Sequence, residues 1–251
     1  MPPDAPLDTP PDIPPDIGSP PSGAGTPPSG GWPITGVIFD FHSTLVSGGD
    51  PHGWLVDAWQ RLERPGVPAD ALDAAGLAAF LDRIWEHARP LDPANTRDLS
   101  PELHREVFDT TIVSAPGYDA DLADALYAAM PGRWAAYDDA GATLDTLRTR
   151  GVRTAILSNV GFDLRPVLDR NGLAGRFDVL VMSYEVGVAK PRPEIFARTL
   201  ELLGVEAHEA LMVGDSWHDD AAAAALGIRT LILPRTDGPV HGLDIVLRLV
   251  G

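Results

Sequence analysis

Three side chains that could take part in catalysis stand at the ends of short apolar runs, where the chain could form buried strands. They are Asp40, Ser158 and Asp215, and two more acids, Asp219 and Asp220, follow the last of them. Parallel strands bring their carboxyl ends to one edge of a sheet, so these distant residues should become neighbours. Carboxylates gathered in this way repel one another and require a compensating cation. Oxygen ligands without cysteine or histidine at zinc-site spacing favour Mg²⁺.

A single lysine adds to this pattern. Of the 19 basic residues, 18 are arginine, and the one lysine is Lys190. It follows another apolar run and precedes a helix that begins at Pro193, which places it at the same edge of the sheet. An ammonium group is a compact point charge that fits where the planar guanidinium does not. We therefore expect Lys190 to lie within the site.

The elements that must position these residues alternate between strand and helix. Helical patterns over 140–150, 163–170, 193–203 and 218–226 end at glycine or at Asn-Gly, as helices commonly do. Strands joined by single helices form a parallel sheet covered on both faces. The sequence thus predicts a doubly wound α/β core with a parallel five-stranded sheet. Its strands would be Val37–Phe39, Thr154–Leu157, Val179–Met182, Ala210–Val213 and Thr230–Leu233.

More than a hundred residues separate the first two of these strands, and most of them have helical patterns. Four helices are expected, over 53–63, 69–88, 101–113 and 119–130. Helices inserted after the first strand would form a lid above the carboxyl ends of the strands. We predict a core of residues 32–47 and 138–251, a helical cap of residues 48–137 and a tail of residues 1–31.

The tail has the composition of a disordered or polyproline segment. Residues 1–31 hold 11 of the 25 prolines and neither lysine nor arginine. Such a segment could dock to a proline-binding partner or could simply be a solubilising extension. The sequence identifies no partner for it.

The overall composition excludes several classes of function. A formal charge of −17 repels nucleic acid and anionic membrane surfaces, so we expect neither as a partner. The absence of cysteine excludes disulfides, thiolate zinc sites and cysteine nucleophiles. No run has the length of a membrane helix, and the residues after Met1 lack the pattern of a signal peptide, so a cytoplasmic location is expected.

Taken in order, these residues resemble the four signature motifs of the haloacid dehalogenase superfamily of hydrolases, with a cap inserted after the first motif. The resemblance covers about 32–251 and rests on Asp40–Leu45, Ser158, Lys190–Pro191 and Gly214–Asp220. It implies a metal-dependent phosphatase that acts on a small phosphorylated molecule. Asp40 would be the nucleophile that forms an aspartyl-phosphate.

The resemblance also implies roles for the other motif residues. Ser158 would hydrogen-bond the phosphoryl oxygens, Lys190 would neutralise charge on nucleophile and phosphate, and Thr44 and Asn159 would join the substrate-binding set. Asp215 would bind Mg²⁺ together with Asp40 and the backbone carbonyl of His42. Either Asp220 or Asp219 would hold metal-bound water, and Asp220 matches the commoner spacing of the family.

His42 departs from the family pattern, because phosphatases of the family have a second aspartate at this position as general acid and base. An imidazole of ordinary pKa could perform both tasks near neutral pH. Two other interpretations stay open. The enzyme could cleave a bond other than a phosphate ester, such as a carbon–halogen bond, or the fold could bind a ligand with reduced catalysis.

Substrate recognition would depend on cap residues whose direction the sequence does not determine. The candidates either face the crevice or serve the packing and surface of the cap. They are His52, Trp54, Trp59, Trp85, His87, Arg89 and His104.

Overall fold

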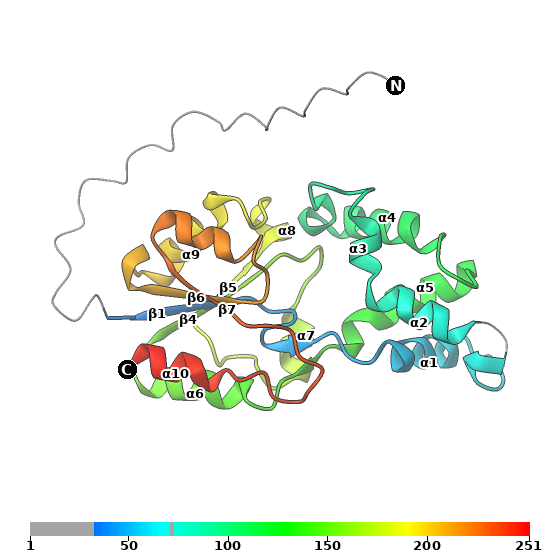
Figure 1. Cartoon of the computed structure of the whole chain (residues 1–251), viewed down its shortest axis with the longest axis horizontal. Coiled ribbons are helices and arrows are strands. Elements are labelled where there is room, and N and C mark those ends of the chain that lie inside the picture. Colours follow the sequence, from blue (N-terminus) through cyan, green and yellow to red (C-terminus); the bar gives the residue numbers. More distant parts are fainter. Residues whose placement is uncertain (1–32, 71–72) are drawn as a thin grey trace, which may run out of the picture. The chain divides into compact units, whose positions relative to one another are not determined.

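A parallel five-stranded sheet forms the centre of the protein in a computed structural model, which describes residues 33–70 and 73–251 (Figure 1). The strand order is β5–β4–β1–β6–β7. The chain first builds outward from β1 to β4 and β5, and then returns to the other side of β1 for β6 and β7. This reversal makes the fold doubly wound, as the sequence predicts, and ligands bind at such a reversal point. The strands are β1 (Gly36–Phe39), β4 (Arg153–Ser158), β5 (Val179–Met182), β6 (Ala210–Gly214) and β7 (Arg229–Ile232).

Both faces of the sheet are buried, which explains the continuous apolar runs. On β1, Val37 and Phe39 pack toward one face and Ile38 toward the other. Helices α6, α7 and α10 cover the first face and α9 covers the second, and Figure 1 shows α6 and α10 opposite α9. The core helices are α6 (Ala140–Thr149), α7 (Arg165–Arg170), α8 (Ser183–Val186), α9 (Pro193–Leu203) and α10 (Asp244–Val250).

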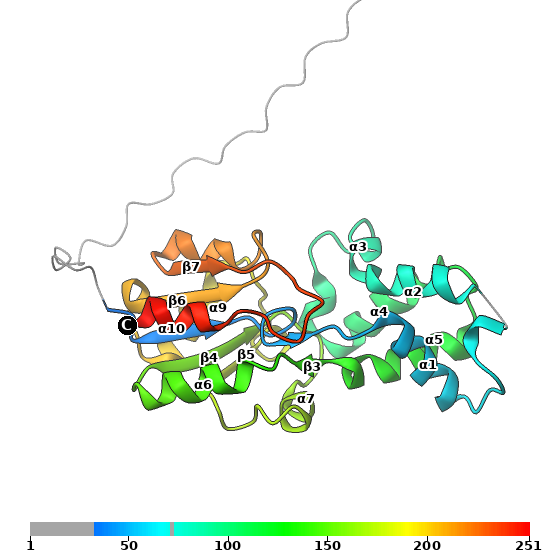
Figure 2. The ribbon, with the colours of Figure 1, turned by 60° about the horizontal axis from the view of Figure 1, so that its bottom comes forward.

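The cap is a group of helices between β1 and β4, joined to the core through a short antiparallel ribbon of β2 and β3. It has its own hydrophobic core, to which Trp54, Trp59, Leu81 and Phe108 contribute. Figure 2 shows the cap helices together beyond β3. The elements are β2 (Val46–Ser47), α1 (Pro51–Arg61), α2 (Ala74–Asp82), α3 (Ile84–Ala88), α4 (Pro101–Ile112), α5 (Ala120–Ala129) and β3 (Ala135–Ala136). The exact limits of core and cap stay a prediction.

The cap contacts the core through the 3₁₀ turn Thr96–Leu99. Ser183, at the start of α8, donates a hydrogen bond from Oγ to the carbonyl oxygen of Asp98 at 2.5 Å. Gly161, in the loop after β4, lies so close to the Arg97 carbonyl and His104 that a Cβ would collide with both. This glycine therefore permits close packing between the cap and the core.

Two helices differ from the sequence-based expectations. The expected helix over 69–88 is instead α2 and α3, because Asp73 caps α2 through Gly76 N and the backbone of Arg83 leaves the helical region with φ −120°. The expected helix over 218–226 is a 3₁₀ helix over Ala221–Leu226. There the first turn is taken up by a loop in which Ser216 N donates to Asp220 Oδ2. The other 3₁₀ segments are Pro68–Asp70, Met130–Arg133 and Ala207–Glu209.

Two further expectations concern the proline-rich tail and the absence of a membrane helix. The prediction for the proline-rich tail lies outside the described residues. Within residues 33–70 and 73–251, none of the helices combines the length and apolar character needed to cross a membrane.

Candidate active site

The loop after β1 directs Asp40 toward the sheet edge and holds its carboxylate. Thr44, fully buried, donates from Oγ1 to Asp40 Oδ2 at 3.1 Å. Ser43 has φ 67°, a left-handed conformation that is strained for a residue with a side chain. The Ser43 amide is held by the Val46 carbonyl at 2.7 Å. This tight loop places Thr44 against Asp40, the expected nucleophile, and the expected contact of Thr44 with substrate stays a prediction.

Lys190 lies between two buried carboxylates. Its Nζ donates to Asp40 Oδ1 at 2.7 Å and to Asp220 Oδ1 at 2.6 Å. Burial opposes the charge of this ammonium group, but the two carboxylates outweigh it and raise the pKa of Lys190. Burial raises the pKa of Asp40 and of Asp220, and Lys190 counteracts the rise in both. The lysine therefore carries a permanent positive charge where the four motif segments meet.

The position of Lys190 is set by Asn159. The Asn159 side chain donates from Nδ2 to the Lys190 carbonyl and accepts from the Lys190 amide at Oδ1, both at 2.8 Å. The polar atoms of its side chain are thus engaged with the backbone of Lys190, which they position, and a role of Asn159 in substrate binding stays a prediction. Ser158 is buried at the end of β4, next to Leu157, whose carbonyl accepts from Lys190 Nζ at 3.2 Å.

Asp215 pairs with a residue that the sequence analysis did not single out. Arg235, from the segment after β7, donates from Nε to Asp215 Oδ2 at 2.6 Å. The arginine side chain is exposed, whereas that of Asp215 is nearly buried. No motif marks Arg235, because its partner lies on a different strand and only the fold brings them together.

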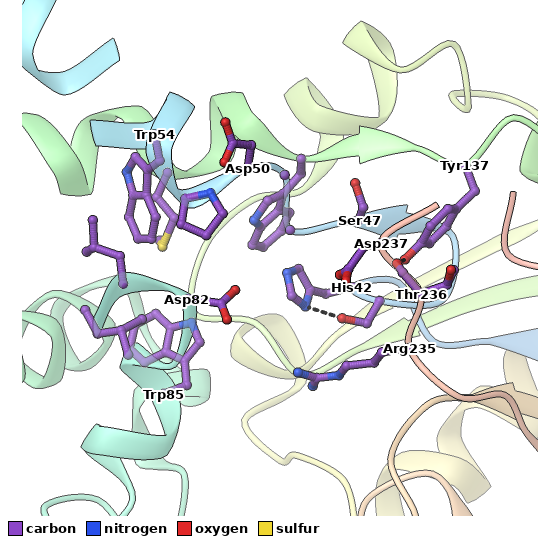
Figure 3. A pocket seen from close by; sticks show the side chains of 18 residues that line it. His42, Ser47, Asp50, Trp54, Asp82, Trp85, Tyr137, Arg235, Thr236 and Asp237 are labelled. Carbon is purple, nitrogen blue, oxygen red and sulfur yellow. Dashed lines mark hydrogen bonds between the residues drawn. The ribbon is translucent and has the colours of Figure 1, made fainter. Parts of the chain in front are cut away.

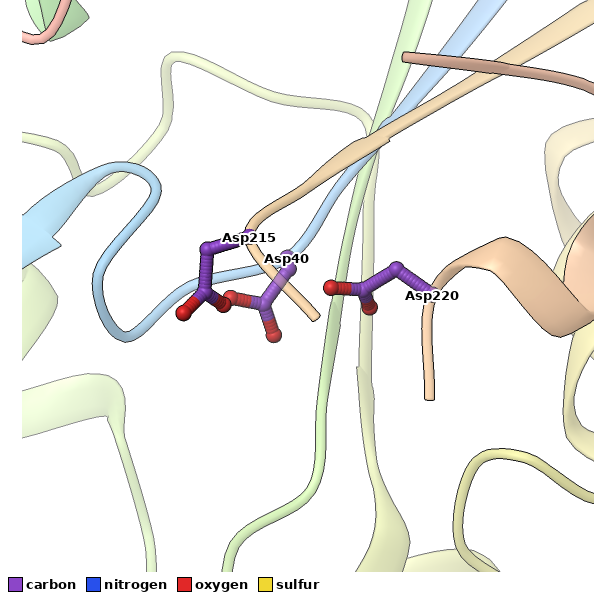
Figure 4. Close-up of side chains that lie close together, drawn as sticks. All are labelled: Asp40, Asp215 and Asp220. Atoms are coloured by element: carbon purple, nitrogen blue, oxygen red, sulfur yellow. The ribbon is translucent and has the colours of Figure 1, made fainter. Parts of the chain in front are cut away.

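Three carboxylates converge where a metal ion could bind. Asp40, Asp215 and Asp220 each place one oxygen so that the three atoms lie within 4.8 Å of one another (Figure 4). Three negative charges face two positive ones, Lys190 and Arg235, and the charge of Asp215 adds to the raised pKa of Asp40. An excess of buried negative charge among oxygen ligands fits a hard divalent cation such as Mg²⁺.

Of the two adjacent acids, Asp220 belongs to this cluster. Asp220 is fully buried, and its approach requires Gly214, since a Cβ there would collide with the Asp220 carboxylate. Asp219 turns elsewhere, with Oδ2 against Ser216 Oγ at 3.2 Å and Oδ1 against His218 Nδ1 at 2.8 Å. Two consecutive residues thus occupy different environments.

His42 is half-buried and packs against Trp134, with ring centroids 4.9 Å apart. Burial first, and then the charge of Arg235, lower the pKa of His42 to about 4. The imidazole is therefore neutral at neutral pH, and its pKa differs from the ordinary value that the sequence alone suggests. In this state it accepts a proton more readily than it donates one.

A cavity of about 500 Å³ opens beside His42 and is lined by both cap and core (Figure 3). Among the cap candidates, Trp54 and Trp85 line it. Trp59 is packed in the cap, with Arg64 over its ring at 5.1 Å. His104 is buried and shares a hydrogen bond of 2.9 Å with Tyr127. Further lining residues that the sequence analysis did not select include Trp134, Tyr137 and Arg235.

The sequence of this chain matches the model of a known protein family. A family model described as haloacid dehalogenase-like hydrolase matches residues 34–227. The chain belongs to this family of hydrolases. The match spans the whole cap and the four segments that form the site.

Several relatives carry an assigned activity. Phosphoserine phosphatase of Thermus thermophilus is 34% identical over 186 residues, which are 73% of this chain and 65% of the relative. The plasmid phosphoglycolate phosphatase of Cupriavidus necator is 33% identical over 202 residues, 78% of this chain and 79% of the relative. The chain spans about two thirds or less of the length of the first curated relatives it matches.

The fold of this chain is also similar to the folds of solved structures. L-2-haloacid dehalogenase of Xanthobacter autotrophicus has a TM-score of 0.58 and 23% identity, covering 87% of this chain and 84% of its own. At this identity the likeness shows a shared fold alone. Phosphatases and dehalogenases thus use one architecture, and the side chains of the site must distinguish between them.

Proposed function

We propose that the protein is a Mg²⁺-dependent phosphatase that hydrolyses a small phosphomonoester, with Asp40 as nucleophile. The observation that carries this proposal is the contact of one buried ammonium group, Lys190, with both Asp40 and Asp220, beside a third carboxylate on Asp215. Such a charge cluster suits the binding of a cation and a phosphate together. The relatives named as phosphatases support it.

The first step transfers the phosphoryl group to the enzyme. A carboxylate oxygen of Asp40 attacks phosphorus, the bond from phosphorus to the leaving oxygen breaks, and an aspartyl-phosphate forms. Lys190 would offset the negative charge that develops on the phosphoryl oxygens, and the hydroxyl of Ser158, the last residue of β4, would donate to them.

The second step restores the carboxylate. Water attacks the phosphorus of the aspartyl-phosphate, loses a proton to a base, and releases inorganic phosphate with the freed Asp40. His42 is the group of the site that can accept this proton, since it is neutral in the free protein. In the first step, a bound phosphate dianion would favour the protonated imidazole, which could then donate to the leaving oxygen.

Magnesium would be held by Asp40, Asp215 and the His42 carbonyl, with Asp220 supporting the site from its contact with Lys190. When bound, the ion supplies positive charge that screens the phosphate from the surrounding carboxylates. Arg235, which pairs with Asp215, would have to release this carboxylate before it could bind an ion.

The decisive experiment measures phosphate release from an aryl phosphate with Mg²⁺ or with EDTA. We expect turnover that requires Mg²⁺ and falls at least about 1,000-fold in Asp40→Asn. Asp169→Asn, at an exposed position, is the matched control and should retain activity. Thermal melting of both variants establishes that each is folded.

Two outcomes would overturn the proposal. One is release of chloride from 2-chloropropionate without Mg²⁺ and without any phosphatase activity, which would identify carbon–halogen chemistry. The other is a folded protein that binds Mg²⁺ and phosphate analogues without turnover of any ester, which would identify a binding role.

A further inference from the structure

We propose that the cavity beside His42 binds a leaving group that carries an ammonium group, so that the substrate is the phosphomonoester of an amino alcohol. This inference rests on the proposed function for the phosphate end of the molecule. The new element is the chemistry of the leaving group, which the cavity of about 500 Å³ would hold.

The walls of the cavity are rich in indole rings. Trp54, Trp85 and Trp134 all line it. Trp54 uses its Nε1 to donate to the Leu126 carbonyl at 2.8 Å, so its polar atom is satisfied inside the cap. The aromatic face of such a ring attracts cations through its quadrupole, and tryptophan does so most strongly.

The positions of these rings are fixed by packing. Trp134 contacts His42, and its ring centroid lies 5.5 Å from that of Phe162. The ring of Trp85 lies 4.8 Å from that of His104 and has the Arg97 guanidinium 5.2 Å from its centroid. Rings held in this way offer a preformed surface, which lowers the entropy cost of binding.

One carboxylate of the cavity lacks a partner in the part of the chain that the structure describes. In Figure 3 the Asp82 side chain lies between Trp54 and Trp85 and points into the cavity. Among the described residues, Asp82 makes no side-chain hydrogen bond or ion pair, although it follows directly on the buried Leu81. A carboxylate next to aromatic faces suits an ammonium ion, which would gain from both.

The remaining charges of the cavity favour a cation over an anion. Asp50 and Asp237 also line it, and Asp50 caps α1 by accepting from His52 N and Gly53 N. These backbone bonds lower the pKa of Asp50, so it stays charged. The guanidinium of the cavity, Arg235, is already paired with Asp215. A carboxylate-bearing leaving group would therefore face three acids, which outnumber the single arginine among the lining residues.

Binding of the leaving group can be measured without any turnover. Choline serves as the cationic probe, and 3,3-dimethyl-1-butanol serves as its neutral analogue of nearly the same shape. We expect choline to change the tryptophan fluorescence of the full chain saturably, with a dissociation constant at least about 10-fold below that of the neutral alcohol. Equal binding of the two would overturn the inference and show a merely apolar cavity.

A single variant tests the role of Asp82. Asp82→Asn removes the charge and keeps the size of an exposed side chain, so the fold should persist. We expect choline affinity to fall about 5-fold while affinity for the neutral alcohol stays unchanged. Asp169→Asn is the control and should change neither. An unchanged affinity for choline in Asp82→Asn would contradict the proposed site.

Turnover distinguishes failure of this inference from failure of the phosphatase proposal. We expect kcat/KM for choline phosphate to exceed those for 3,3-dimethylbutyl phosphate and phosphoglycolate by at least about 10-fold. Hydrolysis of an aryl phosphate without this preference would refute the inference alone. Choline binding without hydrolysis of any ester would refute the phosphatase proposal and support the ammonium site.

Discussion

Arg235 and Asp215 form an ion pair of 2.6 Å, although they come from the ends of neighbouring strands that no shared motif connects. The pair gives Asp215 a cation within the protein itself. If Asp215 binds Mg²⁺ as proposed, Arg235 and the metal ion would compete for one carboxylate. The guanidinium is largely exposed, so it can withdraw from this contact.

Removal of this competitor should strengthen metal binding. In Arg235→Gln we expect the dissociation constant for Mg²⁺ to decrease about 2- to 5-fold, because an ion pair whose guanidinium is exposed to water contributes about 1 kcal/mol. Isothermal titration calorimetry of the full chain measures this directly. Arg198→Gln, which removes an exposed arginine paired with Glu201, is the control. Weaker Mg²⁺ binding in Arg235→Gln would show that the arginine supports the metal site.

Loss of the buried lysine should destabilise the fold. In Lys190→Met, Asp40 and Asp220 lose their shared cation, and we expect the free energy of unfolding in EDTA to fall by about 3–5 kcal/mol. Urea denaturation at pH 7 measures it. The double variant Lys190→Met/Asp220→Asn should recover part of the loss, because one uncompensated carboxylate is gone.

The loss of unfolding free energy in Lys190→Met should also depend on pH. Both carboxyl pKa values are raised in the folded protein, and without Lys190 they rise further. A carboxyl whose pKa is higher in the folded state favours folding at low pH, and that contribution is lost as the pH rises. The stability gap between Lys190→Met and the wild type should thus narrow from pH 7 to pH 5. A constant gap would contradict the assignment of the two carboxylates.

His104 should make the cap sensitive to acid. Burial, and then the charge of Arg97, lower the pKa of His104 to about 4. In the unfolded chain the ring has a pKa near ~6.5, so the unfolded state takes up the proton first as the pH falls. The stability that the neutral ring contributes above this pH is lost between about pH 6.5 and pH 4.

His104→Gln isolates this contribution. The free energy of unfolding of the wild type should fall by up to about 3 kcal/mol relative to His104→Gln between pH 7 and pH 4. Chemical denaturation at several pH values measures the difference. A difference that does not change with pH would mean that the ring titrates normally.

The proton role of His42 predicts a dependence on the leaving group. In His42→Asn we expect kcat/KM for an alkyl phosphate to fall about 100-fold, and that for an aryl phosphate by less than about 10-fold, since kcat/KM reports the transfer to Asp40 and a phenolate leaves without a proton. His42→Asp, which restores the family pattern, should recover part of the alkyl activity. Steady-state kcat/KM values on the two esters provide the test. An equal loss of kcat/KM on both esters would contradict the role of His42 as the acid for the leaving oxygen.

Much of the fold follows from local sequence. The apolar runs around Ile38 and Met212 identify strands buried on both faces, because only a doubly covered sheet accommodates them. The grouping of Asp40, Lys190 and Asp215 also follows, since parallel strands share one edge. The break at Arg83 and the 3₁₀ helix after Asp220 could not be predicted, because both depend on local hydrogen bonds rather than on apolar periodicity.

The sequence by itself determined the strands, the presence of a helical insertion and the set of acids around the single lysine. The tertiary structure alone decided that Asp220 turns to Lys190 while Asp219 turns away, and that Asn159 holds a backbone segment. It also decided that Arg235 meets Asp215 and that Trp54 and Trp85 face a common cavity. The physical reason is that residue types and periodicity determine which segments must be buried. The direction of each polar side chain depends on partners that only the folded chain brings within hydrogen-bonding distance.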